Sequence, residues 1–321
     1  MNARGNQRDD VLTVVVVSAN SARWLPGCLS SLYAHAGALT IDVVVVDSGS
    51  TDETSEIVGR FPGARLVRCE NHGFAHGNNR GVETSTAQWI LLLNPDTEFV
   101  SGTLDELVAM AAGHPRGGIF GVRQTWPDGS LQYSIRRFPT ATRLLGQALA
   151  SESWPIHPRW SGERELDETV YAQPVRCDWT TGSCLLVRRD LYEELGGMDE
   201  RFFLFSEEPD LCLRARRRGW ETWHLPTITL IHHGGGSEAD SPSLAAQLVT
   251  SKRLYLEKHA GRVSRAAGIA ALTLGLALRA VFGSRRGVGG GRRNARVALA
   301  TLWGLRRPPF AELTVGHPSD D

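Results

Sequence analysis

Polar side chains follow three apolar runs of this sequence, at the points where strands are predicted to end. In open α/β sheets, ligands bind beyond the carboxyl ends of the strands, so groups that follow successive strands face one site. A single acid in such a place is usually a turn residue. Three clusters together instead predict a shared polar site rich in carboxylate and amide oxygens. The clusters are Ser18 and Asn20, the stretch Asp47-Ser48-Gly49-Ser50-Thr51-Asp52, and Asn94-Pro95-Asp96.

Two further groups of residues could carry chemistry. Glu207, Glu208 and Asp210 open a predicted helix that ends in several arginines. This charge order also suits the helix dipole, without any other function. His232 and His233 follow a predicted strand and precede a run of glycines, so they could bind a metal or be purely structural.

Three glycines, Gly73, Gly77 and Gly81, recur every four residues and therefore share one face of a predicted helix. A face without side chains permits close approach of another backbone or of a phosphate. Tight helix packing explains the spacing equally well. The spacing is not the G-x-G-x-x-G of dinucleotide-binding proteins, and the sequence contains no G-x-x-x-x-G-K-[ST] motif.

The elements that would position these groups alternate between strands and helices. The run 11–17 is continuously apolar and β-branched, as in a parallel strand buried on both faces. The alternation predicts a mostly parallel, doubly wound α/β sheet. We expect residues 123–176 to form long loops over the site. The expected strands are 11–17, 41–46, 65–68, 89–93, 119–122, 184–187 and 227–231, and the expected helices are 24–33, 50–60, 73–85, 104–112, 190–195 and 209–218.

Length and composition suit a globular protein without disulfides. The chain has 321 residues, of which 41% are hydrophobic and 22% are charged, enough for one large α/β domain with an extension or for two domains. Its five cysteines form no C-x-x-C pair, so neither a zinc site nor a redox motif is indicated. We expect reduced thiols in a cytosolic protein. Residues 1–10 are polar, contain no apolar signal segment and are predicted to be disordered.

The net charge of zero hides an acidic body and a basic tail. From Lys252 to Arg307 the chain carries 13 Lys or Arg residues and a single acid, Glu257. Two apolar stretches in this tail, 266–278 and 297–305, are shorter than the roughly 20 residues of a membrane-spanning helix. Their basic flanks favour helices that lie in the surface of an anionic membrane. Helices packed on the rest of the protein are the alternative, and no nucleic-acid partner is expected because no recognised module accompanies the charge.

Six blocks stand out, in the order VVVVSAN…CLSSL, VVVVDSGSTDET, ENHGFAHGNNRG, LLLNPDTE, TGSCLLVRRDLYEELGGMDERFFLFSEEPDLCLRARRRGW and IHHGGGS. They resemble the ordered blocks of family-2 glycosyltransferases, and most of all the bacterial rhamnosyltransferase-like branch. The resemblance covers residues 11–260. It implies a GT-A-like fold, which is a Rossmann-like, mostly parallel twisted sheet flanked by helices, and transfer of a sugar from a nucleotide donor with inversion.

The resemblance also implies a division of the chain. Residues 11–260 would form the catalytic domain, with a nucleotide-sugar-binding half at 11–122 and an acceptor-binding half at 123–260. A basic, amphipathic helical extension at 261–321 would follow and would associate with the membrane.

By the same resemblance, residues at the ends of the early strands bind the donor. Asp47 and Ser48 would contact the nucleotide base, and Asp52 would support the loop that carries them. The implied donor-binding residues are Ser18, Asn20, Asp47, Ser48, Asn71, Gly73, Asn78, Asn94 and Asp96.

The segment Asn94-Pro95-Asp96 stands where the family carries its D-x-D metal motif. Asn94 replaces the first acid, so Asp96 would be the metal-binding carboxylate. His232 would be a second ligand or would contact the diphosphate, with His233 as the alternative. Mg²⁺ needs few protein ligands when phosphates and waters complete its shell, whereas Mn²⁺ better suits a site with a histidine, so either ion is expected.

The family's catalytic base lies in an acidic pair, here Glu207-Glu208, and we favour Glu208, with Glu207 as the alternative. This carboxylate would take the proton of the acceptor hydroxyl as the hydroxyl oxygen attacks the anomeric carbon. A second acid and a diphosphate nearby should raise the pKa of the base. Trp179 and Gly182 stand where the family shapes the acceptor side, although a buried structural role for Trp179 fits the sequence equally well.

The resemblance favours dTDP-L-rhamnose as the donor, with a UDP- or GDP-sugar as the alternative, and a polyprenyl-linked or cell-wall glycan as the acceptor. Such an acceptor places the protein in the cytoplasm, peripherally bound to the inner face of the plasma membrane. Asn94 suggests a non-catalytic nucleotide-sugar- or glycan-binding module instead, although Asp96 and Glu208 argue against it. A nucleotidyltransferase would need a basic, glycine-rich loop after the first strand, and in 18–26 only Arg23 is basic.

Overall fold

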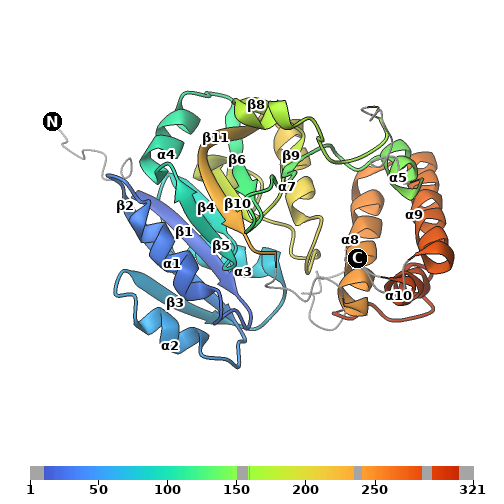
Figure 1. Cartoon of the computed structure of the whole chain (residues 1–321), viewed down its shortest axis with the longest axis horizontal. Coiled ribbons are helices and arrows are strands. Elements are labelled where there is room, and N and C mark those ends of the chain that lie inside the picture. Colours follow the sequence, from blue (N-terminus) through green and yellow to red (C-terminus); the bar gives the residue numbers. More distant parts are fainter. Residues whose placement is uncertain (1–10, 150–157, 159, 235–240, 284–290, 311–321) are drawn as a thin grey trace.

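The computed structural model describes residues 11–149, 158, 160–234, 241–283 and 291–310. A sheet domain and a smaller helical region lie side by side (Figure 1). The segment 1–10, predicted to be disordered, and residues 311–321 at the end of the basic tail lie outside the described residues.

The sheet domain is built on a mostly parallel sheet that has nine strands in the described part of the chain. The strand order is β3-β2-β1-β4-β10-β6-β11-β5, and β8 pairs with β11. β10 runs antiparallel to both of its neighbours, and β5 runs antiparallel to β11. The strands are β1 Val11–Ser18, β2 Thr40–Ser48, β3 Ala64–Cys69, β4 Trp89–Leu93, β5 Thr97–Ser101, β6 Gly117–Thr125, β8 Val175–Cys177, β10 Cys184–Arg188 and β11 Glu221–His232, and a separate ribbon pairs β7 Ile135–Arg136 with β9 Trp179–Thr180.

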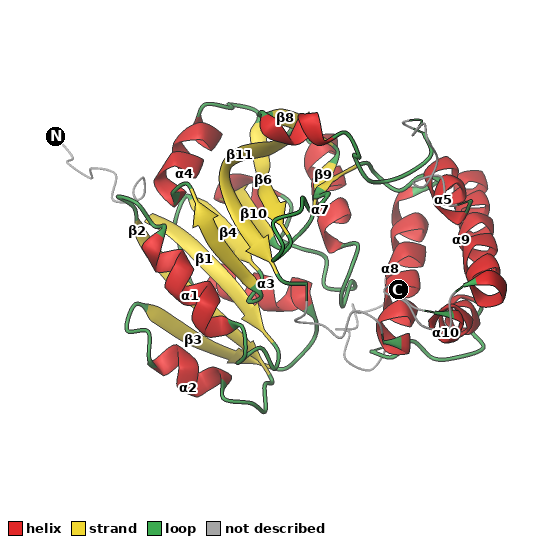
Figure 2. Ribbon diagram, viewed as in Figure 1, coloured by secondary structure: helices red, strands yellow, loops and turns green. Residues whose placement is uncertain are grey.

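Helices cover both faces of the sheet (Figure 2). Alternate residues of β1 fill two cores, with Val14 and Val16 on the face covered by α1 and α4, and Val15 and Val17 on the face covered by α3 and α7. Because both faces are buried, the strand is apolar at every position rather than at every second one. The helices of this domain are α1 Leu25–Ala34, α2 Thr54–Gly59, α3 Phe74–Glu83, α4 Leu104–Ala112, α6 Arg189–Glu194 and α7 Glu207–Arg217.

The helical region consists of α5 Ala141–Ala148, α8 Pro242–His259, α9 Arg262–Phe282 and α10 Arg292–Leu302. Helix α8 lies nearest to the sheet domain and α9 lies on the outside (Figure 1). Small residues let these helices approach closely, because Gly268 of α9 lies against Leu256 and Gly275 lies against Ala148. At 21 residues, α9 is longer than the apolar stretch 266–278, and its length and composition would allow it to cross a membrane.

Two expectations about the elements were wrong. The helix expected at 50–60 begins at Thr54, because Ser50 and Thr51 are hydrogen-bonded to Asn20 in the neighbouring loop. The stretch 123–176, expected to be irregular, contains α5, β7, β8 and a 3-10 helix at Glu168–Ala172. Helix α5 is stabilised by burying Leu144 against α8 and α9, a contact between distant parts of the chain that no local pattern indicates.

Candidate active site

The ends of β1, β2 and β3 lie in a row at one edge of the sheet. The register pairs Ser18 of β1 with Asp47 of β2, and it pairs Ser48 with Cys69 of β3. Asn71 follows β3 by two residues at the same edge. The residues that were expected to bind the donor follow three different strands, and the structure places them next to one another.

Two loops at this edge hold each other through hydrogen bonds. Asn20 Oδ1 accepts from the backbone N–H of Thr51 at 2.8 Å, and the N–H of Asn20 donates to Ser50 Oγ at 3.0 Å. Asp52 Oδ2 accepts from the N–H of Ala22 at 2.8 Å. Asn20 has a φ of 55°, a left-handed conformation that is uncommon for a residue with a side chain. The bonds across the two loops stabilise it.

Asp47 is buried, and its carboxylate is hydrogen-bonded to the loop that follows β2 and to the first turn of α2. Its Oδ1 accepts from the N–H of Ser50 at 2.9 Å, and its Oδ2 accepts from Ser55 Oγ at 3.2 Å. The buried hydroxyl of Ser18 lies 3.3 Å from Thr54 Oγ1. The polar atoms of this edge are thus bonded to one another, and these bonds fix their directions before any ligand binds.

The glycine row of α3 packs on the sheet. A Cβ added at Gly77 would lie 2.6 Å from a methyl group of Val17, and one at Gly81 would lie 2.3 Å from a methyl group of Val15. Close packing of a helix on a sheet therefore accounts for these two glycines.

Gly73 precedes α3 and touches the loop that leads to the acidic pair. Its φ is 98°, and a Cβ there would lie 2.1 Å from the backbone oxygen of Phe203, which accepts from the N–H of Phe74 at 2.8 Å. Asn71 Oδ1 accepts from the N–H of Gly73 at 3.2 Å. Asn78 is fully buried and donates to the Phe74 backbone oxygen at 2.9 Å, so it lies within the helix packing rather than on an open surface.

Strands β5 and β11 bring Asp96 and His232 together. Thr97, the first residue of β5, pairs with His232, the last residue of β11. His232 Nε2 lies 3.5 Å from Asp96 Oδ1, and the other ring nitrogen, Nδ1, lies 3.1 Å from Gln132 Oε1. Donation from Nδ1–H to Gln132 leaves the lone pair of Nε2 directed toward Asp96, which is the arrangement of a metal-binding histidine.

His233, the alternative ligand, turns the other way. Its backbone N–H donates to the Asp96 backbone oxygen at 2.9 Å. Its ring stacks on Trp24 with centroids 4.6 Å apart, and its Nε2 lies 3.1 Å from Glu98 Oε1. Of the two histidines, His232 is the one whose ring faces Asp96.

Asp96 and His232 fit a divalent cation that binds together with a diphosphate. Within the described ranges, no group of three or more His, Cys, Asp or Glu side chains is placed to hold a metal ion. A cation beside Asp96 would therefore need phosphate oxygens and waters as its other ligands, as Mg²⁺ commonly has. A closed structural site of the zinc type does not match this donor set.

Glu207 and Glu208 are the first two residues of α7. The two residues before them, Phe205 and Ser206, both have a φ of 69°, which is strained for residues with side chains. Glu208 Oε1 accepts from the N–H of Gly182 at 2.9 Å. Glu207 is only 2% exposed, and its Oε2 has no hydrogen-bond partner among the described residues, so Glu208 is the more accessible acid.

Burial raises the pKa of both acids. The pKa of Glu208 is raised by burial, although N–H groups including that of Gly182 and the positive charge of Arg136 act in the opposite direction. The pKa of Glu207 is raised well above its ordinary value, first by burial and then by the charge of Glu208. The pKa of Glu208 is thus raised, as expected, but the cause is burial and not a neighbouring like charge.

The segments that contain Asp96 and Glu208 meet beside β10. The N–H of Asn94 donates to the backbone oxygen of Ser183 at 2.9 Å, and the preceding residue, Gly182, donates to Glu208. Asp96 lies two residues beyond Asn94. The segment that contains Asp96 and the side chain of Glu208 are therefore hydrogen-bonded to two adjacent residues of the short loop before β10.

Trp179 and Arg136 lie next to this loop along the chain and on the ribbon that precedes it. They pair across the β7–β9 ribbon, and the guanidinium of Arg136 lies 5.9 Å from the centre of the indole ring. Trp179 Nε1 donates to the Arg137 backbone oxygen at 2.9 Å. The half-buried indole thus holds the ribbon that places the charge of Arg136 near Glu208.

Comparison with known proteins identifies the family. The sequence pattern of the family described as Glycosyl transferase family 2 matches residues 13–196. The N-acetylglucosaminyl-diphospho-decaprenol L-rhamnosyltransferase of Mycobacterium tuberculosis (strain H37Rv) is 32% identical over 267 residues, which are 78% of this chain and 86% of that protein. The chain belongs to glycosyltransferase family 2.

Further relatives of this family-2 glycosyltransferase confirm the predicted branch and fold. Rhamnosyltransferase WbbL of Escherichia coli K12 is 24% identical over 230 residues, which are 68% of this chain and 82% of that protein. The solved mannosyltransferase PcManGT from Pyrobaculum calidifontis, in complex with GDP-Man and Mn²⁺, matches with a TM-score of 0.54 and 18% identity over 94% of this chain and 82% of that one. Staphylococcus aureus TarS matches with a TM-score of 0.52 and 17% identity over 85% of this chain and 44% of that one. Such low identities establish the GT-A fold alone.

Two residues of the site were not found from the sequence. Gln132 orients His232, and Arg136 places its charge near Glu208. Both lie in the stretch that was expected to be irregular, and each acts on a residue far away in the chain. Strand β5, which begins directly after Asp96 and pairs with the strand that ends at His232, was also not anticipated. Its residues Thr97 and Phe99 nevertheless alternate with more exposed residues, as an edge strand requires.

We expect Gly182→Ala to lower the rate of sugar transfer by about a hundredfold, because displacement of a catalytic group by about 1 Å can cost that much. The added Cβ would lie 2.6 Å from Glu208 Oε1 and would force the carboxylate to move. Gly59→Ala is the control, since a Cβ there meets nothing within 4 Å. Steady-state turnover and the melting temperature of each variant are the measurements, and equal turnover of the two variants would contradict this role of Gly182.

Proposed function

We propose that this glycosyltransferase moves L-rhamnose from dTDP-L-rhamnose to a lipid-linked or cell-wall glycan, with inversion at the anomeric carbon. The observation that carries the proposal is the pair of bonds beside β10, from Asn94 to Ser183 and from Gly182 to Glu208. These bonds join the segment that contains Asp96 to the candidate base. The names of two relatives, which are rhamnosyltransferases, support the choice of sugar.

The donor would bind over the ends of β1, β2, β3 and β4. Asp47 and Ser48 would contact the base, and the linked loops of Asn20 and Asp52 would hold them in place. Asn71 and Gly73 would lie beside the sugar diphosphate. The absence of a side chain at position 73 lets the loop that leads to Glu207 and Glu208 come close. The full set is Ser18, Asn20, Asp47, Ser48, Asn71, Gly73, Asn78, Asn94 and Asp96, with Asn78 acting from within the helix packing.

Asp96 and His232 would hold Mg²⁺ or Mn²⁺ together with the diphosphate. A divalent cation there stabilises the negative charge that develops on the leaving nucleoside diphosphate. Gln132 would keep the ring of His232 in the orientation in which Nε2 can bind the cation.

Glu208 would accept the proton of the acceptor hydroxyl. As the hydroxyl oxygen bonds to the anomeric carbon, the bond from that carbon to the diphosphate oxygen breaks, and the electron pair leaves with the nucleoside diphosphate. A single displacement of this kind inverts the configuration. The bond from the Gly182 N–H to Oε1 would leave Oε2 of Glu208 to take the proton, and Trp179 would border the bound acceptor.

The acceptor would reach the site from a membrane. We propose a donor half at 11–122, an acceptor half at 123–260 and a membrane-associated extension at 261–321. Helix α5 of the acceptor half buries Leu144 in a common core with α9 of the extension, which would keep the two parts together. An acceptor anchored by a polyprenyl chain would then meet the site at the inner face of the plasma membrane, with the protein bound peripherally from the cytoplasm.

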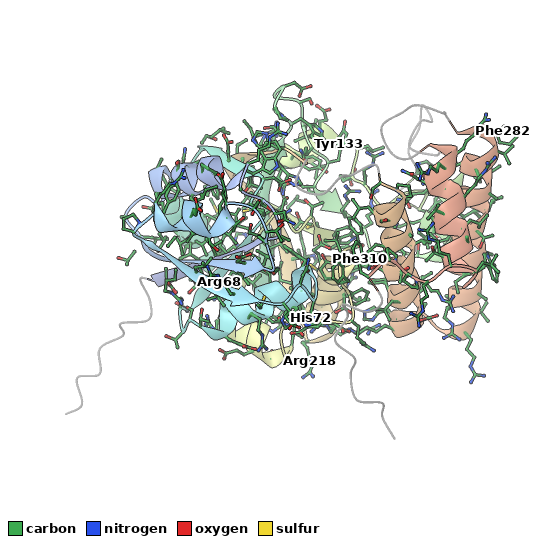
Figure 3. All side chains as sticks on the ribbon, turned by 90° about the horizontal axis from the view of Figure 1, so that it is seen from below. Arg68, His72, Tyr133, Arg218, Phe282 and Phe310 are labelled. Atoms are coloured by element: carbon green, nitrogen blue, oxygen red, sulfur yellow. The ribbon has the colours of Figure 1, made fainter. Side chains whose placement is uncertain are left out.

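Helix α9 presents an apolar face to solvent. Its buried residues are small, and between Arg265 and Arg279 it carries no charge. Phe282, at the end of α9, lies at the outer end of the helical region, far from the sheet domain (Figure 3). The exposed face consists of Val263, Ala266, Ala267, Ala270, Leu274 and Val281.

The proposed partner of this face is the surface of an anionic membrane. Arginines at both ends of α9 and the basic first turn of α10 complement anionic headgroups. A position along the surface fits better than a membrane crossing, because Gly268 and Gly275 hold the inner face of α9 against the other helices. A crossing helix would have to leave these contacts.

Turnover with a panel of nucleotide sugars tests the proposed function. We expect transfer from dTDP-L-rhamnose to a polyprenyl-linked acceptor to exceed transfer from UDP- and GDP-sugars, and we expect EDTA to abolish it until Mn²⁺ or Mg²⁺ is restored. Asp96→Asn should lower the rate about a hundredfold or more, because the cation would lose its carboxylate ligand. Donor binding without transfer of any sugar would contradict the proposal and would favour a non-catalytic binding module.

Glu208→Gln should lower kcat by about 10² to 10⁴-fold, since an amide cannot accept the proton. Wild-type kcat should fall as the pH drops through the pKa of Glu208, because only the ionised carboxylate is a base. Burial raises this pKa, so the fall should begin at a higher pH than for an ordinary glutamate. A pH–rate profile of the wild type checks this, and a loss confined to the matched variant Glu207→Gln would assign the base to Glu207 instead.

Charges on the outer face of α9 should release the protein from membranes. We expect Leu274→Glu and Val281→Glu to lower the fraction that floats with phosphatidylglycerol vesicles by about tenfold, because each charge would have to enter the interface. Val100→Glu is the control, since Val100 is 48% exposed on the sheet domain. Binding of the wild type should also weaken in high salt and with phosphatidylcholine vesicles. Unchanged flotation of the α9 variants would refute this face as the membrane contact.

A further inference from the structure

Residues 199–210, here called the base segment, carry the acidic pair and run beside helix α8 of the helical region (Figure 1). The segment contains the loop before α7 and the first turn of α7. It receives contacts from the helical region at both ends and in the middle. Each contact comes from a residue at least 40 positions further along the chain.

The two ends of the base segment are held by the last turn of α8. Lys258 Nζ lies 2.6 Å from Asp199 and 2.5 Å from Asp210, and His259 Nε2 lies 2.7 Å from Asp210. Asp210 is fully buried, two residues beyond Glu208. Burial alone would raise the pKa of Asp210, but the bonds to His259 and Lys258 and the charge of Arg214 bring it below its ordinary value. Asp210 is thus a charged anchor rather than a second base.

The middle of the base segment is held by α8 and by the residue that ends the described tail. Ser251 Oγ donates to the Leu204 backbone oxygen at 2.7 Å, and the side chain of Gln247 supports this bond by donating to Ser251 Oγ at 3.1 Å. Phe310 stacks on Phe203 with centroids 4.4 Å apart and planes inclined by 10°. Phe310 lies where the helical region meets the sheet domain (Figure 3).

These contacts stand next to the strained part of the backbone. Phe205 and Ser206 follow Leu204 directly and precede Glu207, and both have a φ of 69°. A left-handed conformation at two successive residues with side chains costs energy and persists only where the surroundings enforce it. The conformation of this pair sets the direction in which α7, and with it Glu208, leaves the loop.

We propose that the helical region positions the catalytic base, with Ser251, Lys258 and Phe310 as positioning residues that keep the base segment in its strained conformation. None of the three touches the reacting atoms. They act through the backbone of Phe203 to Ser206 and through the charged anchor at Asp210. The inference rests on the proposed function only in taking Glu208 as the base.

The test compares variants of the full-length protein in pairs. Ser251→Ala removes the hydroxyl that holds Leu204, and Thr250→Val is its control, because the Thr250 hydroxyl bonds to Ala246 within the same helix. Phe310→Ala removes the stacked ring, and Phe310→Tyr keeps it. For each variant we measure kcat, the KM for the donor, the pH dependence of kcat and the melting temperature.

We expect Ser251→Ala to lower kcat by about tenfold, the scale of one hydrogen bond, and Phe310→Ala to lower it by a similar factor, the scale of one aromatic pair, while the KM for the donor changes less than about twofold. The loosened segment would admit water to Glu208, so the pH at which kcat is half-maximal should move down toward that of an ordinary glutamate. Thr250→Val and Phe310→Tyr should keep the wild-type rate and profile.

Three results would overturn the inference. One is wild-type kcat in both Ser251→Ala and Phe310→Ala. Another is an equal loss in Thr250→Val, and the third is a loss of kcat with an unshifted pH profile, which would reflect a smaller folded fraction only. A wild-type protein without transfer activity would instead overturn the proposed function itself, so the two failures are distinguishable.

Discussion

The direction of β10 determines how the two halves of the site come together. This strand runs antiparallel between β4 and β6, whereas β1, β2 and β4 run parallel to one another. Because it is reversed, β10 begins at the edge where β4 ends, and the loop before it lies beside the loop after β4. The bond from Asn94 to Ser183 and the bond from Gly182 to Glu208 both follow from this reversal. A parallel strand in the same place would begin at the opposite edge, and the acidic pair would have no connection to Asp96.

The surroundings stabilise the negative charges of the two adjacent acids, Glu207 and Glu208, to different extents. Desolvation disfavours both charges, and the charge of Glu208 further disfavours that of Glu207. Glu208 receives the Gly182 N–H and the nearby charge of Arg136, whereas Glu207 Oε2 has no partner among the described residues. Burial and the charge of Glu208 therefore raise the pKa of Glu207 well above its ordinary value. In the proposed mechanism, Glu208 is the acid of the pair that acts as the base.

The sequence predicted the sheet domain well because its strands are buried on both faces and its helices are regular. The run 89–93 and the helix 104–112 were predicted with their observed bounds. The features that the sequence did not predict depend on contacts between residues that are far apart in the sequence. Helix α5 is stabilised through Leu144 by helices that come about a hundred residues later. Gln132 has a role only because β11 ends beside it, 100 residues further on. Local propensity contains no information about such pairs, whereas the family blocks indicated Asp96 and Glu208 because those motifs are themselves local.

The placement of glycines follows from the same need to hold the base segment closely. Gly73, after β3, leaves room for the Phe203 backbone, and Gly182, before β10, leaves room for the Glu208 carboxylate. Each glycine also presents its N–H or that of the next residue, so that the segment is held by backbone bonds on two sides. Helix α8 holds it on a third side through Ser251 and Lys258. Backbone groups cannot change rotamer as side chains do, so the proposed base, held by the Gly182 N–H, would keep its direction while donor and acceptor exchange. The strain at Phe205 and Ser206 is the cost of fitting one loop between these neighbours, and the helical region, rather than the sheet alone, supplies the contacts that offset it.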